Sequence, residues 1–212
     1  MNKITKLEFQ KNKERVNIYI DDKFFMGVYA EIIYSLNLKV GKEIDSSNLL
    51  NLISNEMYLK AKDTALKILS SSSQSEKNIR QKLLKKDFEA EIIDKVINFL
   101  KEYNFLNDED LAKRIVSDNI NLNKYGKNKI KYNLVNKGID EKTISKTLCE
   151  MVDEDVEFEN AMYLAKKKLE KIKDTDKNKV YKKLAYHLSY KGFDFEITKR
   201  VIKKLLKYDL YE

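Results

Sequence analysis

The first sixty residues alternate apolar and polar positions at the spacing of β-strands. The alternation covers residues 3–10 and 16–20, and a third apolar stretch begins at Phe24. A period of two predicts strands that bury one face, so we expect two or three short antiparallel strands in this region. A short helix over 28–38 and a further helix beginning near Asp45 complete the expected N-terminal region.

From Ala61 onward the apolar residues have helical spacing, and their pattern repeats. When Phe88, Ile139 and Phe193 are aligned, apolar residues recur nine and five positions before them and nine and twelve positions after them. The aligned copies are separated by 51 and then 54 residues. A fixed period of this length indicates a repeated unit of supersecondary structure.

Each repeat is expected to contain two helices that meet at a turn, with a third helix before them. The residue that precedes each aligned position is Asp87, Gly138 or Gly192, and these residue types tolerate the left-handed conformation that ends many helices. A capping box of Ser73 and Glu76 is expected to begin one of these helices. The preceding helices are predicted over residues 61–69, 110–122 and 160–172.

The predicted fold is therefore mainly α. Tandem repeats of three-helix modules are expected to form an elongated, curved molecule, with a small N-terminal region that contains a β-hairpin. The predicted boundaries are 1–60 for the N-terminal region and 61–108, 109–152 and 153–212 for the first, second and third repeats.

The composition excludes several classes of protein. The chain of 212 residues has no Pro and only five Gly, which argues against an all-β fold rich in tight turns. A single Cys149 and a single His187 cannot form an internal disulfide or a Cys/His metal site. No apolar run is long enough to span a bilayer, and the N-terminus lacks the apolar core of a signal peptide. We therefore expect a cytoplasmic protein without membrane contact.

The formal net charge of +8 is concentrated in one part of the sequence. Residues 160–212 carry fifteen basic and seven acidic side chains, whereas the earlier segments are close to neutral or slightly acidic. The third repeat is therefore expected to supply most of the long-range attraction to a polyanion. Only four basic residues are Arg and 38 are Lys, which predicts little sequence-specific base recognition. An AT-rich genome would explain the abundance of Lys equally well.

The residues give little support for catalysis. His187 has no Ser or Cys nucleophile motif nearby, and Cys149 lies at the expected end of a helix. We interpret His187 as a half-buried structural residue and Cys149 as a small packing residue. The acidic run 150–159 has no metal-loop signature and is interpreted as a connector that also caps a helix starting near residue 158. We therefore predict a protein that is not an enzyme and that uses no cofactor or metal.

Clusters of basic residues, accompanied by Tyr in the second and third repeats, are the candidate binding surface. Basic residues interleaved with aromatic ones can bind nucleic acid by charge and stacking, although a solvated helix face gives the same pattern, and the residues alone favour that simpler interpretation. The candidate partner-binding or DNA-binding residues are Arg80, Lys85, Lys86, Lys113, Arg114, Lys127, Lys129, Lys137, Lys166, Lys167, Lys168, Lys182 and Lys183.

The ordered set of motifs resembles the RecX family of regulators of the RecA recombinase. The resemblance is carried by the stretch 75–88, the segment FLNDEDLAKRI over 105–115, the KGI and KGF signatures of the second and third repeats and the N-terminal strand region. It extends over essentially the whole chain. The sequence departs from the family pattern at Asp87, where a glycine is expected, and at Asn78 and Asn133, where an acidic residue is common.

The resemblance implies a monomeric regulator, mainly an inhibitor, that lies in the groove of the RecA–DNA filament and restrains ATPase activity and strand exchange. Its implied partners are the RecA filament and, weakly and in a salt-dependent manner, single- or double-stranded DNA. It also shifts the interpretation of the basic clusters towards a binding surface. Two alternatives stay open at this point, namely a helical nucleic-acid-binding protein that acts without RecA and a scaffold that binds only proteins.

Overall fold

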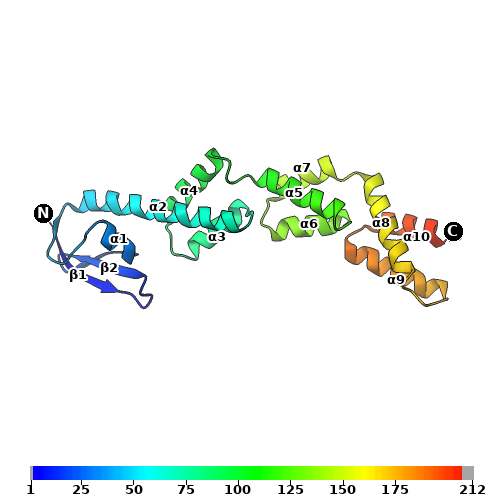
Figure 1. Ribbon diagram of the computed structural model, residues 1–212, viewed down its shortest axis with the longest axis horizontal. Coiled ribbons are helices and arrows are strands. Elements are labelled where there is room, and N and C mark those ends of the chain that lie inside the picture. The colour runs from blue at the N-terminus through cyan, green and yellow to red at the C-terminus, as the bar shows by residue number, and fades with distance from the viewer. Residues whose placement is uncertain (1, 207–212) are drawn as a thin grey trace. The chain divides into compact units, whose positions relative to one another are not determined.

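The computed structural model describes residues 2–206, and its ribbon is mainly helical with a small sheet near the N-terminus (Figure 1). The described chain divides into two compact units. The first unit holds the residues up to Ser72 together with Ile79–Phe105. The second unit holds Ser73–Asn78 and the residues from Leu106 onward.

The first unit begins with a four-stranded antiparallel sheet in the order β3-β2-β1-β4. Its strands are β1 (Asn2–Phe9), β2 (Arg15–Ile20), β3 (Lys23–Tyr29) and the two-residue β4 (Glu43–Ile44). The alternation seen in the sequence is the burial pattern of β2, where every second residue from Val16 to Ile20 is buried. The strands of the N-terminal region are thus confirmed, with β4 as an addition.

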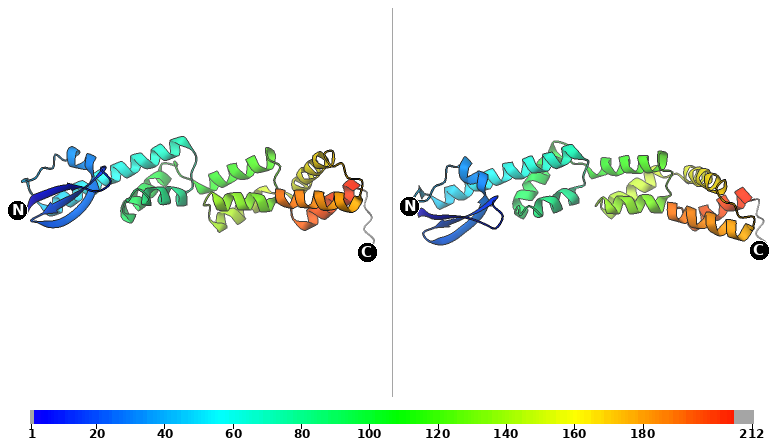
Figure 2. Two further views of the ribbon diagram at one scale, coloured as in Figure 1. Left: turned by 90° about the horizontal axis from the view of Figure 1, so that it is seen from below. Right: turned by 60° about the horizontal axis from the view of Figure 1, so that its bottom comes forward.

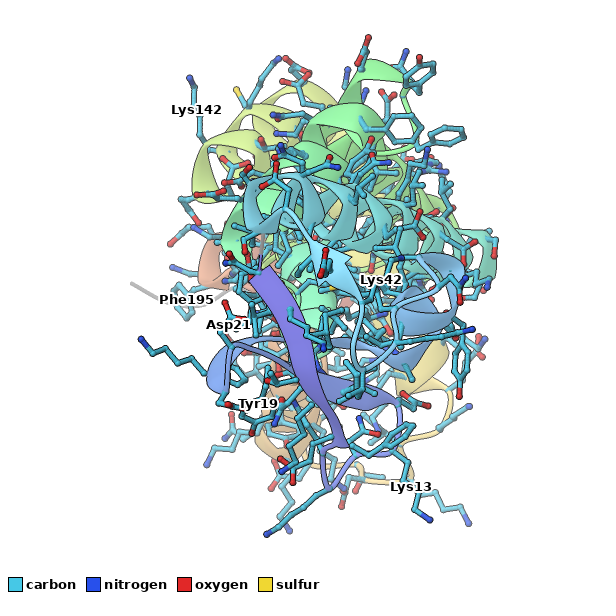
Figure 3. The ribbon with its side chains drawn as sticks, turned by 90° about the vertical axis from the view of Figure 1, so that its left-hand side faces the viewer. Lys13, Tyr19, Asp21, Lys42, Lys142 and Phe195 are labelled. Atoms are coloured by element: carbon cyan, nitrogen blue, oxygen red, sulfur yellow. The ribbon has the colours of Figure 1, made fainter. Side chains whose placement is uncertain are left out.

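Two turns at opposite ends of the sheet join β1 to β2 and β2 to β3. Asp21 and Asp22 both have positive φ, of 48° and 62°, as a tight turn between β2 and β3 requires. Asp21 Oδ1 also accepts a hydrogen bond of 3.0 Å from the backbone of Lys3 on β1. The other turn, between β1 and β2, contains Lys13, and Figure 3 shows Lys13 and Asp21 well separated at this end of the molecule.

The helix α2 (Ser46–Ser71) runs without a break through the predicted boundary at residues 60 and 61. Asp45 caps it by accepting a 3.0 Å hydrogen bond from Ser47 N. The two helical stretches predicted here are therefore one helix, which follows the short helix α1 (Ala30–Ser35). Because α2 contacts α1 and β3 as well as α4, it belongs to both the N-terminal region and the first repeat.

The first repeat is completed by α3 (Glu76–Leu84) and α4 (Ala90–Glu102). The predicted anchor Phe88 is buried, as are Ile79 and Leu83 of α3. The cap of α3 differs from the prediction, because Ser75, and not Ser73, accepts the hydrogen bond from Asn78 N at 3.3 Å. Ser75 is the residue immediately before the helix, where a cap side chain can reach the amide three positions on.

The second unit contains the next two repeats in full. The second repeat comprises α5 (Asp108–Asn121), α6 (Lys127–Asn136) and α7 (Glu141–Met151). The third comprises α8 (Glu154–Leu169), α9 (Lys177–Lys191) and α10 (Phe195–Leu206), whose three helices are seen from two further sides in Figure 2. Each repeat has its own apolar core, which includes the anchors Ile139 and Phe193. The predicted three-helix repeats are confirmed.

The acidic run before α8 is organised differently from the prediction. The helix begins at Glu154 and not near residue 158, because Asp153 accepts hydrogen bonds from the backbone of Asp155 and Val156. Glu157 does not cap its own helix. Its side chain is buried, with 8% of its surface exposed, and it reaches α6 instead.

Candidate interaction surface

The predicted basic residues are divided between the two units. Arg80, Lys85 and Lys86 belong to the first unit, and the others belong to the second. None of the thirteen is buried, so their side chains reach solvent. Arg80 donates to Asp94 Oδ1 at 2.5 Å, which places it in an ion pair within the first repeat.

The third repeat gathers part of its basic residues around one hollow at the α8–α9 hairpin, which we call the α8–α9 hollow. Its volume is about 680 Å³, a size that suits a small ligand or a short segment of a larger one. Five of its lining residues are Lys and three are aromatic. The lining consists of Lys168, Lys171, Ile172, Lys173, Asp174, Lys182, Lys183, Tyr186, His187 and Tyr190.

A smaller hollow of about 300 Å³ adjoins the first and shares Lys168, Lys171 and His187 with it. It adds Lys167 and Lys191 to the same basic surface. Lys166 lies apart from them, because neighbouring residues of a helix point about 100° apart, and it lines a different hollow with Phe158 and Tyr163. The cluster Lys166–Lys168 predicted from the sequence is therefore divided between two sides of α8.

The charges around the α8–α9 hollow are mostly uncompensated. Asp174 is its single acidic lining residue, and it forms an ion pair with Lys183 that lowers the pKa of the Asp174 carboxyl. Within residues 2–206, Lys168, Lys171, Lys173 and Lys182 have no carboxylate at ion-pair distance. The hollow therefore presents several cations that a bound anion could neutralise.

His187 lies in the wall of this hollow. Its side chain is half-buried, as the sequence predicted. Burial lowers the pKa of its imidazole, and the nearby cations of Lys168 and Lys191 lower it further. At neutral pH the uncharged form of the ring therefore predominates, and this form can both donate and accept a hydrogen bond.

Three of the predicted residues, Lys127, Lys129 and Lys137, have structural roles at joints between helices. Lys127 N donates to Glu157 Oε1 at 2.7 Å, so that α8 supplies a carboxylate to the N-terminus of α6. The Lys129 amine lies 5.0 Å from the ring centre of Tyr132 and 5.6 Å from that of Tyr190. Lys127 and Lys137 take part in these joints through their backbone atoms, and their side chains stay exposed.

In all three repeats, the carbonyl at one equivalent position accepts a hydrogen bond from another element. The position lies immediately before the left-handed turn and is occupied by Lys86, Lys137 and Lys191. Lys86 O accepts from Tyr29 Oη at 2.6 Å, Lys137 O from Ser75 Oγ at 2.6 Å and Lys191 O from Gly126 N at 3.0 Å. In each case the donor comes from the chain segment that precedes the repeat. These donors could not be predicted from local sequence patterns, because they belong to elements distant in the sequence from the carbonyls they contact.

The departures from the family pattern also have structural explanations. Asn78 Nδ2 donates to Lys137 O at 3.1 Å, and Asn133 Nδ2 donates to Asn119 Oδ1 at 2.8 Å. Asp87 has φ of 58°, which Asp tolerates better than most residues, and its side chain is exposed. Position 87 thus accommodates a side chain, whereas a Cβ atom would lie 2.8 Å from Ser75 Oγ at Gly138 and 2.3 Å from the backbone of Lys129 at Gly192.

Neither a nucleophile nor a metal cluster stands out in the described part of the chain. Cys149 is exposed, so its interpretation as a packing residue was wrong; it lies on the outer side of α7. Among residues 2–206, no three His, Cys, Asp or Glu side chains converge as a metal site would require. Over the same residues, every helix is too short or too polar to cross a lipid bilayer.

Comparison with protein families matches the chain in four consecutive parts. The Regulatory protein RecX N-terminal domain matches residues 2–45, and the first RecX three-helix domain matches residues 61–100. The second and third RecX three-helix domains match residues 107–148 and 155–202. These matches coincide with the sheet region and the three repeats described above.

Curated relatives match over their whole length. Regulatory protein RecX of Clostridioides difficile (strain 630) is 55% identical over 210 residues, which are 99% of this chain and 98% of the relative. Regulatory protein RecX of Clostridium botulinum (strain Alaska E43 / Type E3) is 39% identical over 215 residues, covering 100% of both chains.

Two solved structures share the fold. The crystal structure of regulatory protein RecX has a TM-score of 0.66 and 27% identity, with 95% of this chain and 98% of that chain covered. The crystal structure of RecX from Lactobacillus salivarius has a TM-score of 0.67 and 27% identity, with 73% and 99% covered. From its full-length relatives and its four matching domains, this chain belongs to the RecX family of regulatory proteins.

Proposed function

We propose that this protein regulates the RecA recombinase, mainly as an inhibitor, by binding in the groove of the RecA–DNA filament and restraining ATPase activity and strand exchange. The observation that carries the proposal is full-length similarity to proteins named Regulatory protein RecX. Bridging neighbouring RecA protomers would limit the motions that accompany ATP turnover. Such an action requires no catalytic residue in the regulator.

The basic surface of the third repeat supports contact with the filament. The α8–α9 hollow is lined by Lys168, Lys171, Lys173 and Lys182, which have no carboxylate partner among residues 2–206. Positive charge of this kind accelerates association with a polyanion and with acidic protein surfaces, and the effect weakens as salt rises. It would add salt-dependent attraction to the DNA within the filament.

The direct test is the ATPase activity of RecA on single-stranded DNA with increasing amounts of this protein. A progressive decrease in ATP hydrolysis is expected, together with co-sedimentation of the protein with RecA filaments. Unchanged ATPase activity at saturating protein in low salt would contradict the proposal.

A pair of charge variants tests the role of the third repeat. Changing Lys166, Lys167, Lys168, Lys182 and Lys183 to Gln should slow association with the filament in low salt, because the long-range attraction is reduced. The matched control changes five lysines of the first repeat that are not candidate binding residues, namely Lys62, Lys67, Lys77, Lys82 and Lys95. Equal association rates for the two variants in stopped-flow measurements would show that the third repeat has no special electrostatic role.

The two other hypotheses predict different results. A nucleic-acid-binding protein that acts without RecA would bind bare DNA tightly, with a steep salt dependence and no added affinity for RecA filaments. A scaffold that binds only proteins would bind the filament with the same affinity after lysines of the third repeat are changed to Ala. The basic, aromatic lining of the α8–α9 hollow favours contact with nucleic acid over the scaffold hypothesis.

A further inference from the structure

The α8–α9 hollow combines lysines with exposed aromatic rings. Electrostatic attraction to an anion accounts for the lysines but not for the exposed rings. Tyr186 and Tyr190 are 76% and 65% exposed, although both rings line the hollow. They are four residues apart on α9, so they project from the same face of the helix. Two large aromatic side chains left open to solvent next to unpaired lysines form a surface typical of contact with bases and phosphates.

We propose that the α8–α9 hollow binds nucleotide units whose bases are unstacked. The phosphates would lie against Lys168, Lys171 and Lys182, and the bases would stack on Tyr186 and Tyr190. The proposal deepens the attraction to DNA described under the proposed function, and its test contains no RecA, so that either proposal can fail without the other.

The spacing of the two rings favours a single strand over a duplex. Four residues of an α-helix rise by about 6 Å along its axis. Successive bases of a duplex strand are separated by only about 3.4 Å. Two successive bases that each stack on one of the rings therefore cannot also stack on each other as they do in a duplex. Unstacked bases are found in a splayed single strand or in a separate nucleotide.

The basic surface extends beyond the hollow. Lys167 and Lys191 line the adjoining smaller hollow. The Lys129 amine of α6, in the second repeat, lies 5.6 Å from the ring centre of Tyr190. A strand that leaves the hollow across these residues would meet further cations, whereas a single free nucleotide would use only the hollow itself.

The hollow also contains one acidic group, and its position does not block the proposed contacts. The Asp174 carboxylate is paired with Lys183, so its charge is compensated within the protein. The lysines assigned to the phosphates are not involved in that pair. Neutral His187 adds a hydrogen-bonding group in the same wall.

The test measures the binding of the full chain to a fluorescently labelled oligothymidylate by fluorescence anisotropy in low salt. The wild-type protein is expected to bind the single strand more tightly than a duplex with the same number of phosphates. Changing both Tyr186 and Tyr190 to Leu should weaken strand binding at least tenfold, because stacking contributes about fivefold or more for each base and two rings are lost. The same change should leave binding of inorganic polyphosphate unaltered.

Control variants separate stacking from charge and from general surface changes. Tyr34→Leu removes a tyrosine that is also 76% exposed but lies on α1, and it should not alter strand binding. Changing both Lys168 and Lys182 to Gln should weaken binding of the strand and of polyphosphate alike. Circular dichroism of each variant confirms that the helices are retained.

Competition with free thymidine triphosphate identifies the source of the nucleotide. Displacement of the strand by the free nucleotide would support the proposal and assign the hollow to free nucleotides, whereas retention of the strand would support it and assign the hollow to polynucleotides. Equal affinity for the single strand, the duplex and polyphosphate, with no effect of the tyrosine changes, would overturn the proposal and leave only a non-specific basic surface.

Discussion

The backbone of Gly126 lies directly against the backbone of Gly192. Gly126 N donates to Lys191 O at 3.0 Å, and Asn128 N donates to Gly192 O at the same distance. A Cβ atom at Gly126 would lie 2.5 Å from the carbonyl group of Gly192, and a Cβ atom at Gly192 would lie 2.3 Å from Lys129. The N-terminus of α6 is thus seated on the C-terminal turn of α9, and only glycine fits at either position.

Replacing Gly192 by Ala is expected to destabilise the second unit by about 2–5 kcal/mol. The residue has φ of +93°, where a side chain costs about 1–2 kcal/mol, and the methyl group would add about 1–3 kcal/mol of steric strain against Lys129. Gly41→Ala is the matched control, because φ there is +92° but the nearest atom, Lys3 Cε, is 3.8 Å away. Urea unfolding followed by circular dichroism should show a clearly larger effect for Gly192→Ala, and equal effects would show that the close contact is unimportant.

The corresponding joint of the second repeat depends on Ser75. This hydroxyl is fully buried, donates to Lys137 O at 2.6 Å and accepts from Asn78 N at 3.3 Å. Ser75→Ala should lower the free energy of unfolding by about 1–3 kcal/mol, because a helix cap and a buried hydrogen bond are lost together. Ser70→Ala removes only an exposed hydrogen bond to Lys67 O and should change the stability by less than about 0.5 kcal/mol. Indistinguishable unfolding curves for the two variants would contradict this role of Ser75.

The fold could be predicted largely from local patterns. Helical spacing identified the buried Ile79 and Leu83, and the positions before the anchors identified the left-handed turns at Gly138 and Gly192. The continuity of α2 could not be predicted, because periodic apolar spacing on either side of residue 60 fits one helix or two. The strand β4 has only two residues and exists through its pairing with β1, which no local pattern reveals.

The candidate site could be predicted only in part. Sequence identified the basic residues of the third repeat, but the separation of Lys166 from Lys167 depends on which sides of α8 pack against α9 and α10. The role of Glu157 at the N-terminus of α6 was missed, because the two groups are 30 residues apart and meet only in the folded chain. The polar residues around Gly126 are typical of a solvent-exposed loop, so the buried contact with Gly192 could not be predicted from them.

Glu157 is expected to respond differently to two substitutions. Burial raises the pKa of its carboxyl above 4.5, although the hydrogen bond from Lys127 N lowers it in part. Glu157→Gln keeps an acceptor for Lys127 N and removes a buried charge, so the stability at neutral pH should be unchanged or slightly higher. Glu157→Ala leaves that amide without its acceptor and should cost about 1–3 kcal/mol.

The pH dependence of stability distinguishes the charge of Glu157 from its hydrogen bond to Lys127 N. Because the folded state holds the proton of Glu157 more tightly than the unfolded state, the contribution of this group to stability rises as the pH falls through the raised pKa towards 4.5. Glu157→Gln should remove this contribution. Urea unfolding of both variants at neutral and mildly acidic pH is the measurement, and a larger loss for Gln than for Ala at neutral pH would refute the assignment.

His187 is expected to make the third repeat less stable in mild acid. Its pKa lies below 6.5 in the folded protein because of burial and the charges of Lys168 and Lys191, so the unfolded state binds the proton more readily. Stability from this group is present above pH 6.5 and is lost as the pH falls from there through the lowered folded pKa. Asp174, the acidic group in the same hollow, has a lowered pKa and does not titrate in this range.

A substitution isolates the contribution of His187. His187→Gln should flatten the decrease in stability between pH 6.5 and about pH 5, because Gln keeps hydrogen-bonding capacity but carries no titrating proton. Urea unfolding of the two proteins across this range is the measurement. Cations at Lys168 and Lys191 cause part of the lowering, so an anion bound in the α8–α9 hollow should raise the pKa of His187 and strengthen binding as the pH falls. Identical pH profiles for the wild type and His187→Gln, with and without oligothymidylate, would exclude His187 as the titrating group.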